Sequence, residues 1–273
     1  MSLSISIIRN KYICQVSDRR FTFKSGNGKA LHFEDSECKS IIYESADAYV
    51  LISYHGIGQF ANGKKTDIWI VETLIEIGNS ATSIYDTVKS IRDKATEYFR
   101  IHCSESAHSF VLTGWLFSPK PRPIIITISN YERFIDNKIS RSPMPESEFK
   151  ESWIRIREDT IHGCAIYCGG LYDKVQSKDW NTLTRIAQAN GAKPADIVAF
   201  IVKAIREAAK RSEYIGKNCM SCFSEAKEIT ASCAYHPSDS SALLYAPHYY
   251  NSKGIAIRNV EIWTGPGLPP WRK

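Results

Sequence analysis

The sequence contains no long apolar run. Its longest apolar segments, at 123–128 and 197–202, are six residues each, whereas a helix that crosses a membrane needs about 20. Within the first fifteen residues, Arg9, Asn10 and Lys11 interrupt the apolar stretch that a secretory signal peptide requires. We therefore expect a soluble cytoplasmic protein that has no membrane partner.

A dense stripe of positive charge is also missing. The net charge of +6 is modest for 273 residues, and basic residues occur in short runs such as Arg19–Arg20 and Lys64–Lys65, dispersed among acids. Proteins that bind nucleic acid normally concentrate positive charge on one surface. The composition therefore argues against a nucleic-acid partner.

The eight cysteines do not follow the spacing of a disulfide framework. They stand at 14, 38, 103, 164, 168, 219, 222 and 233, which is typical of buried reduced thiols in a long cytoplasmic chain. Cys219 and Cys222 form a C-x-x-C spacing, but residues three apart in a strand point to opposite faces, and no second such spacing accompanies them. We expect neither a bound metal nor another cofactor.

The remaining composition is that of an ordinary globular protein, with 43% hydrophobic and 23% charged residues. β-Branched residues and partial alternation predict strands at 3–8 and 12–16, joined through 9–11. A second strand pair is predicted at 40–43 and 49–54. The N-terminal part of the chain is therefore predicted to form a β layer.

Two amphipathic helices are predicted after this layer. One extends from about 67 to 77 and the other from about 84 to 100, where Ser83 and Asp86 form a capping box and apolar residues recur at helical spacing. The second half of the chain repeats this order. Strands are predicted near 109–117, 124–129, 153–157 and 161–167, helices around 183–190 and from Pro194 to about 208, and further strands near 219–224, 232–236 and 254–263.

The order of these elements predicts the fold class. Strands, a helix pair, strands, a second helix pair and final strands favour an α+β domain, in which two antiparallel sheets pack together and a helix pair covers each outer face. This arrangement is a four-layer αββα sandwich. We expect a single domain over 1–273, which ends in an extended tail containing Pro and Trp at about 264–273.

The N-terminal hairpin brings two reactive groups together. With a three-residue connection at 9–11, Ser2 lies opposite Asp18, whereas a two-residue turn would shift the pairing by one. If Met1 is removed, the Ser2 hydroxyl stands beside its own α-amine, which titrates near pH 8 and can accept the hydroxyl proton. Ser2 is therefore a candidate nucleophile.

The same segment resembles the beginning of proteasome β subunits and related N-terminal nucleophile hydrolases. Val-Ser-Asp-Arg-Arg at 16–20 is similar to the hairpin of that family, and Asp18 follows Ser2 by sixteen residues, as it does there. The resemblance implies the αββα fold, a mature chain that begins at its nucleophile, hydrolysis of peptide or other amide bonds, and assembly into homo-oligomers.

The resemblance also implies a set of site residues. They are Ser2 as nucleophile, Asp18 and Lys39 as its triad partners, Gly56 as the donor to the oxyanion, Arg20 as a support for Asp18, and His55 as a residue that lines the pocket. A Lys39 ammonium close to Ser2 would favour the alkoxide-like form of the hydroxyl.

The chain departs from the family pattern at several supporting positions. Ser212 and Ile215 stand where the family commonly has Asp and Ser, and the supporting Ser near Gly169–Gly170 is absent. Two functions therefore remain open. One is a hydrolase that acts through Ser2 once Met1 is removed, and the other is a catalytically inactive relative that serves as an oligomeric binding or assembly module. The residues identify neither the substrate nor an ATPase partner.

Overall fold

The structure is a computed structural model that describes residues 2–24, 30–35, 39–60, 62–78, 83–117, 119–135, 138–156, 163–238, 248–251 and 261–263. Met1 and the predicted tail at 264–273 lie outside these residues. Among the described residues, no helix is both long enough and apolar enough to cross a membrane.

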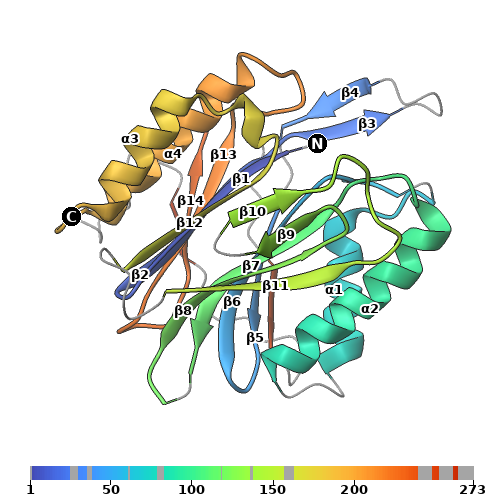
Figure 1. Cartoon of the computed structure of the whole chain (residues 1–273), viewed down its shortest axis with the longest axis horizontal. Coiled ribbons are helices and arrows are strands. Elements are labelled where there is room, and N and C mark those ends of the chain that lie inside the picture. The colour runs from blue at the N-terminus through green and yellow to red at the C-terminus, as the bar shows by residue number, and fades with distance from the viewer. Residues whose placement is uncertain are drawn as a thin grey trace.

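Two six-stranded sheets lie face to face in the described part of the chain (Figure 1). The first sheet contains, in spatial order, β12 (Cys164–Gly170), β1 (Leu3–Arg9), β2 (Tyr12–Asp18), β13 (Cys219–Glu225), β14 (Ser232–His236) and β16 (Glu261–Trp263). The second sheet contains β11 (Lys150–Arg155), β8 (Arg122–Ser129), β7 (Ser109–Leu116), β6 (Ala48–His55), β5 (Ser40–Glu44) and β15 (His248–Asn251). Neighbouring strands are antiparallel, except that β16 and β15 each pair in parallel at one edge.

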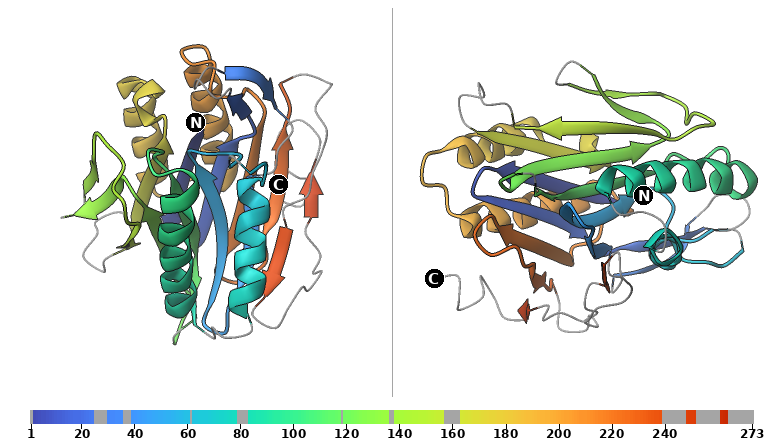
Figure 2. Two further views of the ribbon diagram at one scale, coloured as in Figure 1. Left: turned by 90° about the vertical axis from the view of Figure 1, so that its right-hand side faces the viewer. Right: turned by 90° about the horizontal axis from the view of Figure 1, so that it is seen from below.

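A pair of helices covers the outer face of each sheet (Figure 2). α1 (Thr66–Gly78) and α2 (Ile84–His102) pack on the second sheet, whereas α3 (Ser177–Gln188) and α4 (Pro194–Ala209) pack on the first. The capping box predicted for α2 is present, because Ser83 Oγ accepts the Asp86 N–H at 3.1 Å. The predicted α+β fold, a four-layer αββα sandwich, is confirmed.

Two short hairpins in the described residues add to the predicted elements. β3 (Phe21–Lys24) pairs with β4 (Ala30–Glu34), and β9 (Glu132–Ile135) pairs with β10 (Lys138–Arg141). A 3-10 turn, η1 (Tyr172–Lys174), follows β12. These segments are short, and charged residues interrupt the apolar alternation by which a strand is recognised, so the sequence pattern does not reveal them.

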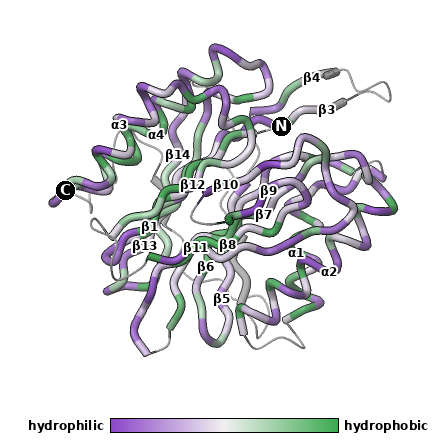
Figure 3. Tube along the Cα trace, viewed as in Figure 1, coloured by the Kyte–Doolittle hydropathy of each residue, from purple (hydrophilic) through white to green (hydrophobic). Residues whose placement is uncertain are grey.

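Three apolar clusters join the layers that the structure describes. One lies between α1, α2 and the second sheet, one between α3, α4 and the first sheet, and one between the two sheets. Because side chains alternate along a strand, β1 places Ile5 and Ile7 beneath the helices and Ile8 between the sheets. Hydrophobic colouring is accordingly prominent along the central strands in Figure 3.

The register of the β1–β2 hairpin differs by one residue from the prediction. Ser4 pairs with Ser17, so the connection contains two residues rather than three. The predicted pairing of Ser2 with Asp18 is therefore wrong, because this register, if continued, places Leu3 opposite Asp18. Ser2 precedes the first residue of β1, where the ladder no longer holds its side chain to one face.

Burial on the helix side explains this register. Ile5 pairs with Val16 and Ile7 with Cys14, and all four side chains lie in the cluster beneath α3 and α4. A three-residue turn would pair Val16 and Cys14 with serines of β1 instead. The observed turn therefore keeps the apolar side chains of both strands on one face.

Truncation of Ile201 tests the packing of α4 on the first sheet. Ile201 is fully buried in that cluster, so Ile201→Ala should lower the free energy of unfolding in urea by about 2–5 kcal/mol. Ile68→Ala on α1 is the control, because 39% of Ile68 is exposed, and it should cost about 0.5 kcal/mol. Equal losses in the two variants would contradict the packing of α4.

Candidate functional site

Three side chains predicted for the site meet beside the start of β1. The Ser2 hydroxyl donates a hydrogen bond to Asp18 Oδ2 at 2.7 Å, and Lys39 Nζ donates to Ser2 Oγ at 2.5 Å and to Asp18 Oδ1 at 3.0 Å. All three side chains are buried. The structure therefore brings the candidate nucleophile, a carboxyl group and an amino group into mutual contact.

Asp18, at the end of β2, accepts hydrogen bonds from several segments. Its Oδ2 also accepts the N–H of Leu3 at 2.6 Å, and its Oδ1 accepts the N–H groups of Arg20 at 2.8 Å and Gly216 at 3.4 Å. A carboxylate can accept through both oxygens, so one side chain serves all these donors. Asp18 thereby positions both the backbone and the side chain of the N-terminal segment.

Lys39, which directly precedes β5, uses three donor bonds at the site. Besides the contacts with Ser2 and Asp18, its Nζ donates to the carbonyl oxygen of Arg20. A Lys ammonium has three donors and no acceptor, so this geometry fixes its orientation. Its positive charge lies against the Ser2 oxygen, where it favours the form that has lost its proton.

The guanidinium of Arg20 binds Asp35 rather than Asp18. Nε and Nη2 each lie 2.6 Å from an Asp35 carboxylate oxygen, and Nη1 donates to the Glu213 carbonyl at 2.6 Å. The hydrogen bonds to Asp35 raise the pKa of Arg20. Arg20 contacts Asp18 through its backbone N–H, so the support expected from this residue comes from its main chain and its side chain anchors the segment after β4.

Gly56 directly follows β6 and lines a small pocket together with Ser2. Its φ of +117° is left-handed, and a Cβ there would approach the Ala107 carbonyl oxygen to 2.4 Å, so the position requires glycine. The space in the pocket is about 20 Å³. It is lined by Ser2, Arg20, Phe21, Thr22, Lys39, Tyr54, His55, Gly56, Ile57 and Gly58. The structure thus places the predicted residues Gly56 and His55 at the same pocket as Ser2.

His55 belongs to a buried polar cluster that sequence reasoning missed. Its Nε2 lies 3.3 Å from Glu132 Oε2, and Glu132 Oε1 accepts Arg141 Nε at 2.8 Å. The Tyr167 hydroxyl and Ser109 Oγ, the latter at 3.3 Å, also donate to Glu132 Oε2. These residues come from five different strands. Their spacing along the chain therefore carries no signal that links them.

Glu132 remains ionised despite its burial. Burial by itself raises the pKa of this carboxyl, but the hydrogen bonds from His55 and Tyr167 and the charges of His55 and Arg141 lower it from an ordinary value of 4.5 to about 2. Burial raises the pKa of Tyr167 well above 10, so its hydroxyl keeps its proton and donates to Glu132. The cluster is thus organised around a permanent negative charge.

The Ser2 carbonyl is anchored beside the end of β12. It accepts the N–H of Leu171 at 2.9 Å, next to Gly170, whose φ is +79°. A Cβ on Gly170 would lie 1.9 Å from the Ser2 carbonyl oxygen, so this close approach also requires glycine. Of the positions that depart from the family pattern, Ile215 is fully buried and Ser212 Oγ accepts a backbone N–H two residues later.

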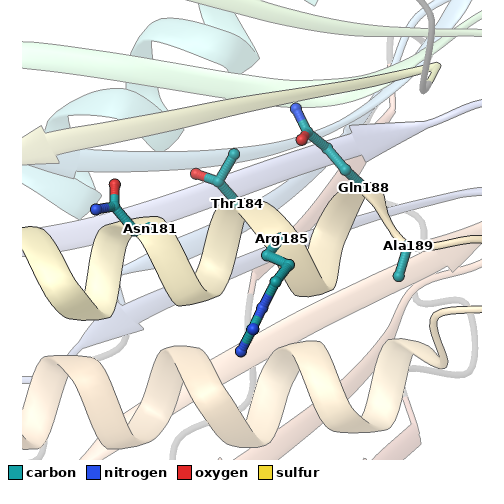
Figure 4. Close-up of a pocket in the computed structure, with 5 residues that line it drawn as sticks. All are labelled: Asn181, Thr184, Arg185, Gln188 and Ala189. Carbon is teal, nitrogen blue, oxygen red and sulfur yellow. The ribbon is translucent and has the colours of Figure 1, made fainter.

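A hollow on α3 is not a candidate site. Figure 4 shows the residues that line it, Asn181, Thr184, Arg185, Gln188 and Ala189. They include no His, Cys, Asp or Glu, so the hollow lacks an acid–base pair. Within the described ranges, no group of three His, Cys, Asp or Glu side chains is arranged to hold a metal ion.

Comparisons with known proteins bear on the fold. Neither a family model nor a curated protein matches the chain. Among solved structures, Anbu from Hyphomicrobium sp. strain MC1 is similar, with a TM-score of 0.55 and 11% identity over 88% of this chain and 89% of that one. The fold is proteasome-like. An Anbu complex from Pseudomonas aeruginosa, described as a helical assembly, has a TM-score of 0.55, 11% identity and 88% coverage of both chains.

These comparisons correct the assignment to the proteasome β-subunit family. The matching structures named above are Anbu proteins, which are proteasome-like but distinct. Neither a family model nor a curated relative supports membership of the N-terminal nucleophile hydrolases. At 11% identity the likeness shows the fold alone. Any role for Ser2, Asp18 and Lys39 must therefore be argued from their geometry.

Glu132 makes the stability of the fold depend on pH. Its pKa in the folded chain, about 2, lies below the ordinary value of 4.5, so its ionised form stabilises the fold above about pH 4.5. This contribution, on the order of 3 kcal/mol, is lost as the pH falls towards 2. Glu132→Gln should therefore lower the free energy of unfolding at neutral pH and flatten its decline in acid, measured by urea titration at a series of pH values.

A surface carboxylate provides the control for this experiment. Glu146 forms exposed ion pairs with Arg133 and Lys150, and such pairs contribute little to stability. Glu146→Gln should therefore keep the acid profile of the unmodified chain. If Glu132→Gln kept it as well, the charged cluster around Glu132 would be contradicted.

Proposed function

We propose that the chain hydrolyses peptide or other amide bonds, with the Ser2 hydroxyl as nucleophile after removal of Met1. The observation that carries the proposal is the position of Ser2 Oγ, 2.7 Å from Asp18 Oδ2 and 2.5 Å from Lys39 Nζ. A serine hydroxyl that lies beside its own α-amine and a buried cation is suited to nucleophilic catalysis.

The α-amine of Ser2 acts as the general base in this proposal. It accepts the hydroxyl proton while Oγ attacks the carbonyl carbon of the amide, and the N–H of Gly56 binds the oxyanion that forms. One such donor contributes about 2.7–4 kcal/mol to stabilisation of a transition state. The α-ammonium returns the proton to the leaving amine. Water then hydrolyses the ester on Ser2 and restores the hydroxyl.

Lys39 and Asp18 prepare the hydroxyl for attack. The Lys39 charge lowers the cost of negative charge on Oγ, and Asp18 holds both Lys39 and the Ser2 hydroxyl in place. When the proton moves from Oγ to the α-amine, the hydrogen bond from Oγ to Asp18 Oδ2 is lost, whereas Lys39 keeps its contacts with Ser2 Oγ and Asp18 Oδ1. The cation that stabilises the developing negative charge is therefore in place before the step.

The walls of the pocket leave little room beside Ser2. Its volume of about 20 Å³ is far below the several hundred Å³ of an ordinary ligand pocket. The Phe21 ring lies so close to Gly58 that a Cβ there would approach Phe21 Cε2 to 2.5 Å, and Tyr54 forms another wall. None of the seven cysteines within the described ranges forms a disulfide, which supports the cytoplasmic location that belongs to this proposal.

Covalent labelling of Ser2 tests the proposal. A preparation whose intact mass shows loss of Met1 should form one ester adduct per chain with a peptide β-lactone, and peptide mass spectrometry should place the adduct on Ser2. Ser2→Ala should abolish the adduct, and Lys39→Met should slow its formation by about 10²-fold, because the cation beside Oγ is lost.

Ser4→Ala is the matched control for the labelling experiment. Ser4 is a buried serine of β1, two residues further along the chain, and its hydroxyl has no hydrogen-bond partner among the described residues. Its replacement should leave the labelling rate unchanged. A chain that lacks Met1 and does not react, or a Ser2→Ala variant that reacts like the unmodified chain, would contradict the hydrolase.

A second function is favoured by the outer helix pair α1–α2. Large apolar side chains are exposed on both helices, with exposed fractions of 39% for Ile68, 46% for Ile75, 57% for Tyr85 and 67% for Ile101. Ile68 and Ile75 lie seven residues, about two turns, apart and so share one face of α1, and an exposed apolar face marks a contact surface. The Pseudomonas aeruginosa Anbu complex is described as a helical assembly. Under this proposal the chain forms homo-oligomers through α1–α2, and an inactive chain would still serve as an assembly module.

Charge substitution on α1 and α2 tests the assembly. The purified chain should have an oligomeric mass in size-exclusion chromatography with light scattering, and Ile75→Glu with Ile101→Glu should reduce that mass by at least about half, because buried unpaired charges oppose association. Gln188→Glu, at the hollow on α3 in Figure 4, is the control and should leave the mass unchanged. A monomeric unmodified chain would contradict the assembly.

A further inference from the structure

We propose that the imidazole of His55 binds the α-amine of Ser2, which makes His55 a positioning residue for the base of the proposed reaction. The inference rests on the proposed function, because the α-amine exists only when Met1 has been removed. It concerns a contact of the N-terminus, and it can be measured whether or not the chain hydrolyses a substrate.

The tautomer of His55 follows from its partner. Glu132 is ionised, and a carboxylate accepts hydrogen bonds but donates none. His55 Nε2, at 3.3 Å from Glu132 Oε2, must therefore carry the proton of this contact. The proposal takes His55 as the neutral imidazole, and in that form Nδ1 is the bare nitrogen and can only accept.

Nδ1 of His55 lacks the donor that this tautomer requires. The side chain is completely buried, and Nδ1 has no hydrogen-bond partner among the described residues. Glu132 cannot turn away to relieve this, because Arg141 and Tyr167 bind its two oxygens. A buried acceptor held in one orientation without a partner indicates a place where a donor binds.

The backbone of Ser2 directs its α-amine to the side on which His55 lies. In an antiparallel pair, a residue whose C=O accepts a bond from the neighbouring strand also turns its N–H towards that strand. The Ser2 carbonyl accepts the Leu171 N–H, at the end of β12. The amine of Ser2 therefore faces β12 at Leu171, which follows Gly169 and Gly170, the partners of Ser4 and Leu3.

His55 packs against the same two glycines. A Cβ on Gly170 would lie 1.9 Å from the Ser2 carbonyl oxygen and 3.3 Å from His55 Cβ, and a Cβ on Gly169 would lie 2.3 Å from His55 Cε1. Ser2 and His55 are thus neighbours across Gly170, and both line the small pocket. The absence of side chains at Gly169 and Gly170 lets the Ser2 carbonyl and the His55 ring approach β12 closely.

The other cations at this pocket already have partners. Lys39 donates to Ser2, Asp18 and the Arg20 carbonyl, and the guanidinium of Arg20 binds Asp35. Removal of Met1 adds a new charged donor, the α-ammonium of Ser2. This group supplies the donor that His55 Nδ1 lacks.

The remaining titratable groups around His55 keep one charge state near neutral pH. Burial lowers the pKa of His108 well below 6.5, and burial raises the pKa values of Tyr131 and Tyr167 well above 10. Glu132 stays ionised and Arg141 stays charged. The groups that face His55 from the packed elements are Glu132, Arg141, Tyr131, Tyr167 and His108, with Ser2, Asp18 and Lys39 at the pocket.

Two substitutions distinguish the contact of His55 Nε2 from the contact proposed for Nδ1. His55→Gln places an amide near the position of Nε2, where it can still donate to Glu132, but leaves no acceptor at the position of Nδ1. His55→Asn places an amide oxygen near Nδ1 and no longer reaches Glu132. The first variant keeps the contact within the cluster and removes the contact proposed for the N-terminus.

The pKa of the α-amine is the decisive measurement. The full chain beginning at Ser2 is prepared by cleavage of a leader directly before that residue, and acetylation of the α-amine by acetic anhydride is followed by peptide mass spectrometry between about pH 6 and 9. A hydrogen bond to the charged form raises a pKa, so His55→Gln should lower the pKa of the α-amine by about 1. His55→Asn should retain most of the unmodified value.

Nitrogen NMR of histidine provides a second measurement on the unmodified protein. The His55 signals, assigned by their loss in His55→Gln, should show a protonated Nε2 and a bare Nδ1. The Nδ1 signal should move between the chain that begins at Ser2 and a chain that retains Met1. The same Nδ1 signal in both chains, or an unchanged α-amine pKa in a folded His55→Gln variant, would overturn the inference.

These outcomes are distinct from those of the β-lactone experiment. If Ser2 is not labelled but His55→Gln lowers the α-amine pKa, the hydrolase fails and the His55 contact stands. If Ser2 is labelled and His55→Gln leaves the α-amine pKa unchanged, the hydrolase stands and the His55 contact is overturned.

Discussion

The site depends on the buried side chain of Asp18. It accepts the Ser2 hydroxyl, the Lys39 amino group and backbone N–H groups from the start of β1, from the connection to β3 and from the segment before β13. A buried charge is costly unless it is paired and fully hydrogen-bonded. Asp18 therefore requires all these segments to be in place together, and the N-terminus is ordered because it completes this set of donors.

The packing of the two sheets assembles the rest of the pocket. Asp18 ends β2 of the first sheet, and Ser2 directly precedes β1 of the same sheet. Lys39 directly precedes β5 of the second sheet, and Gly56 directly follows β6. Neither sheet contains the site by itself, and the apolar cluster between them fixes their separation. The left-handed backbone of Gly56 adds to this, because a side chain there would meet the Ala107 carbonyl and push the pocket apart.

The likeness to Anbu structures, at 11% identity, is a likeness of fold. Many sequences can place apolar residues beneath two helix pairs and between two sheets, so the architecture survives while most residues differ. The chemistry of this chain depends instead on a few polar contacts. Ser2, Asp18 and Lys39 form one such set, and His55 with Glu132 forms another, in which buried charges are balanced between strands of both sheets and the β9–β10 hairpin.

The sequence by itself determined the order of the main elements, the α+β class and the capped start of α2, because periodicity and caps are local properties. It predicted that Ser2 and Asp18 lie near each other, but from a register of the β1–β2 hairpin that is wrong by one residue. Tertiary structure decided the register of that hairpin, since a shift of one residue is resolved only by which face is buried under α3 and α4. The tertiary structure also pairs the Arg20 side chain with Asp35 and brings Glu132 into contact with His55. Those pairings join strands that are distant in the chain, and no local pattern of residues encodes them.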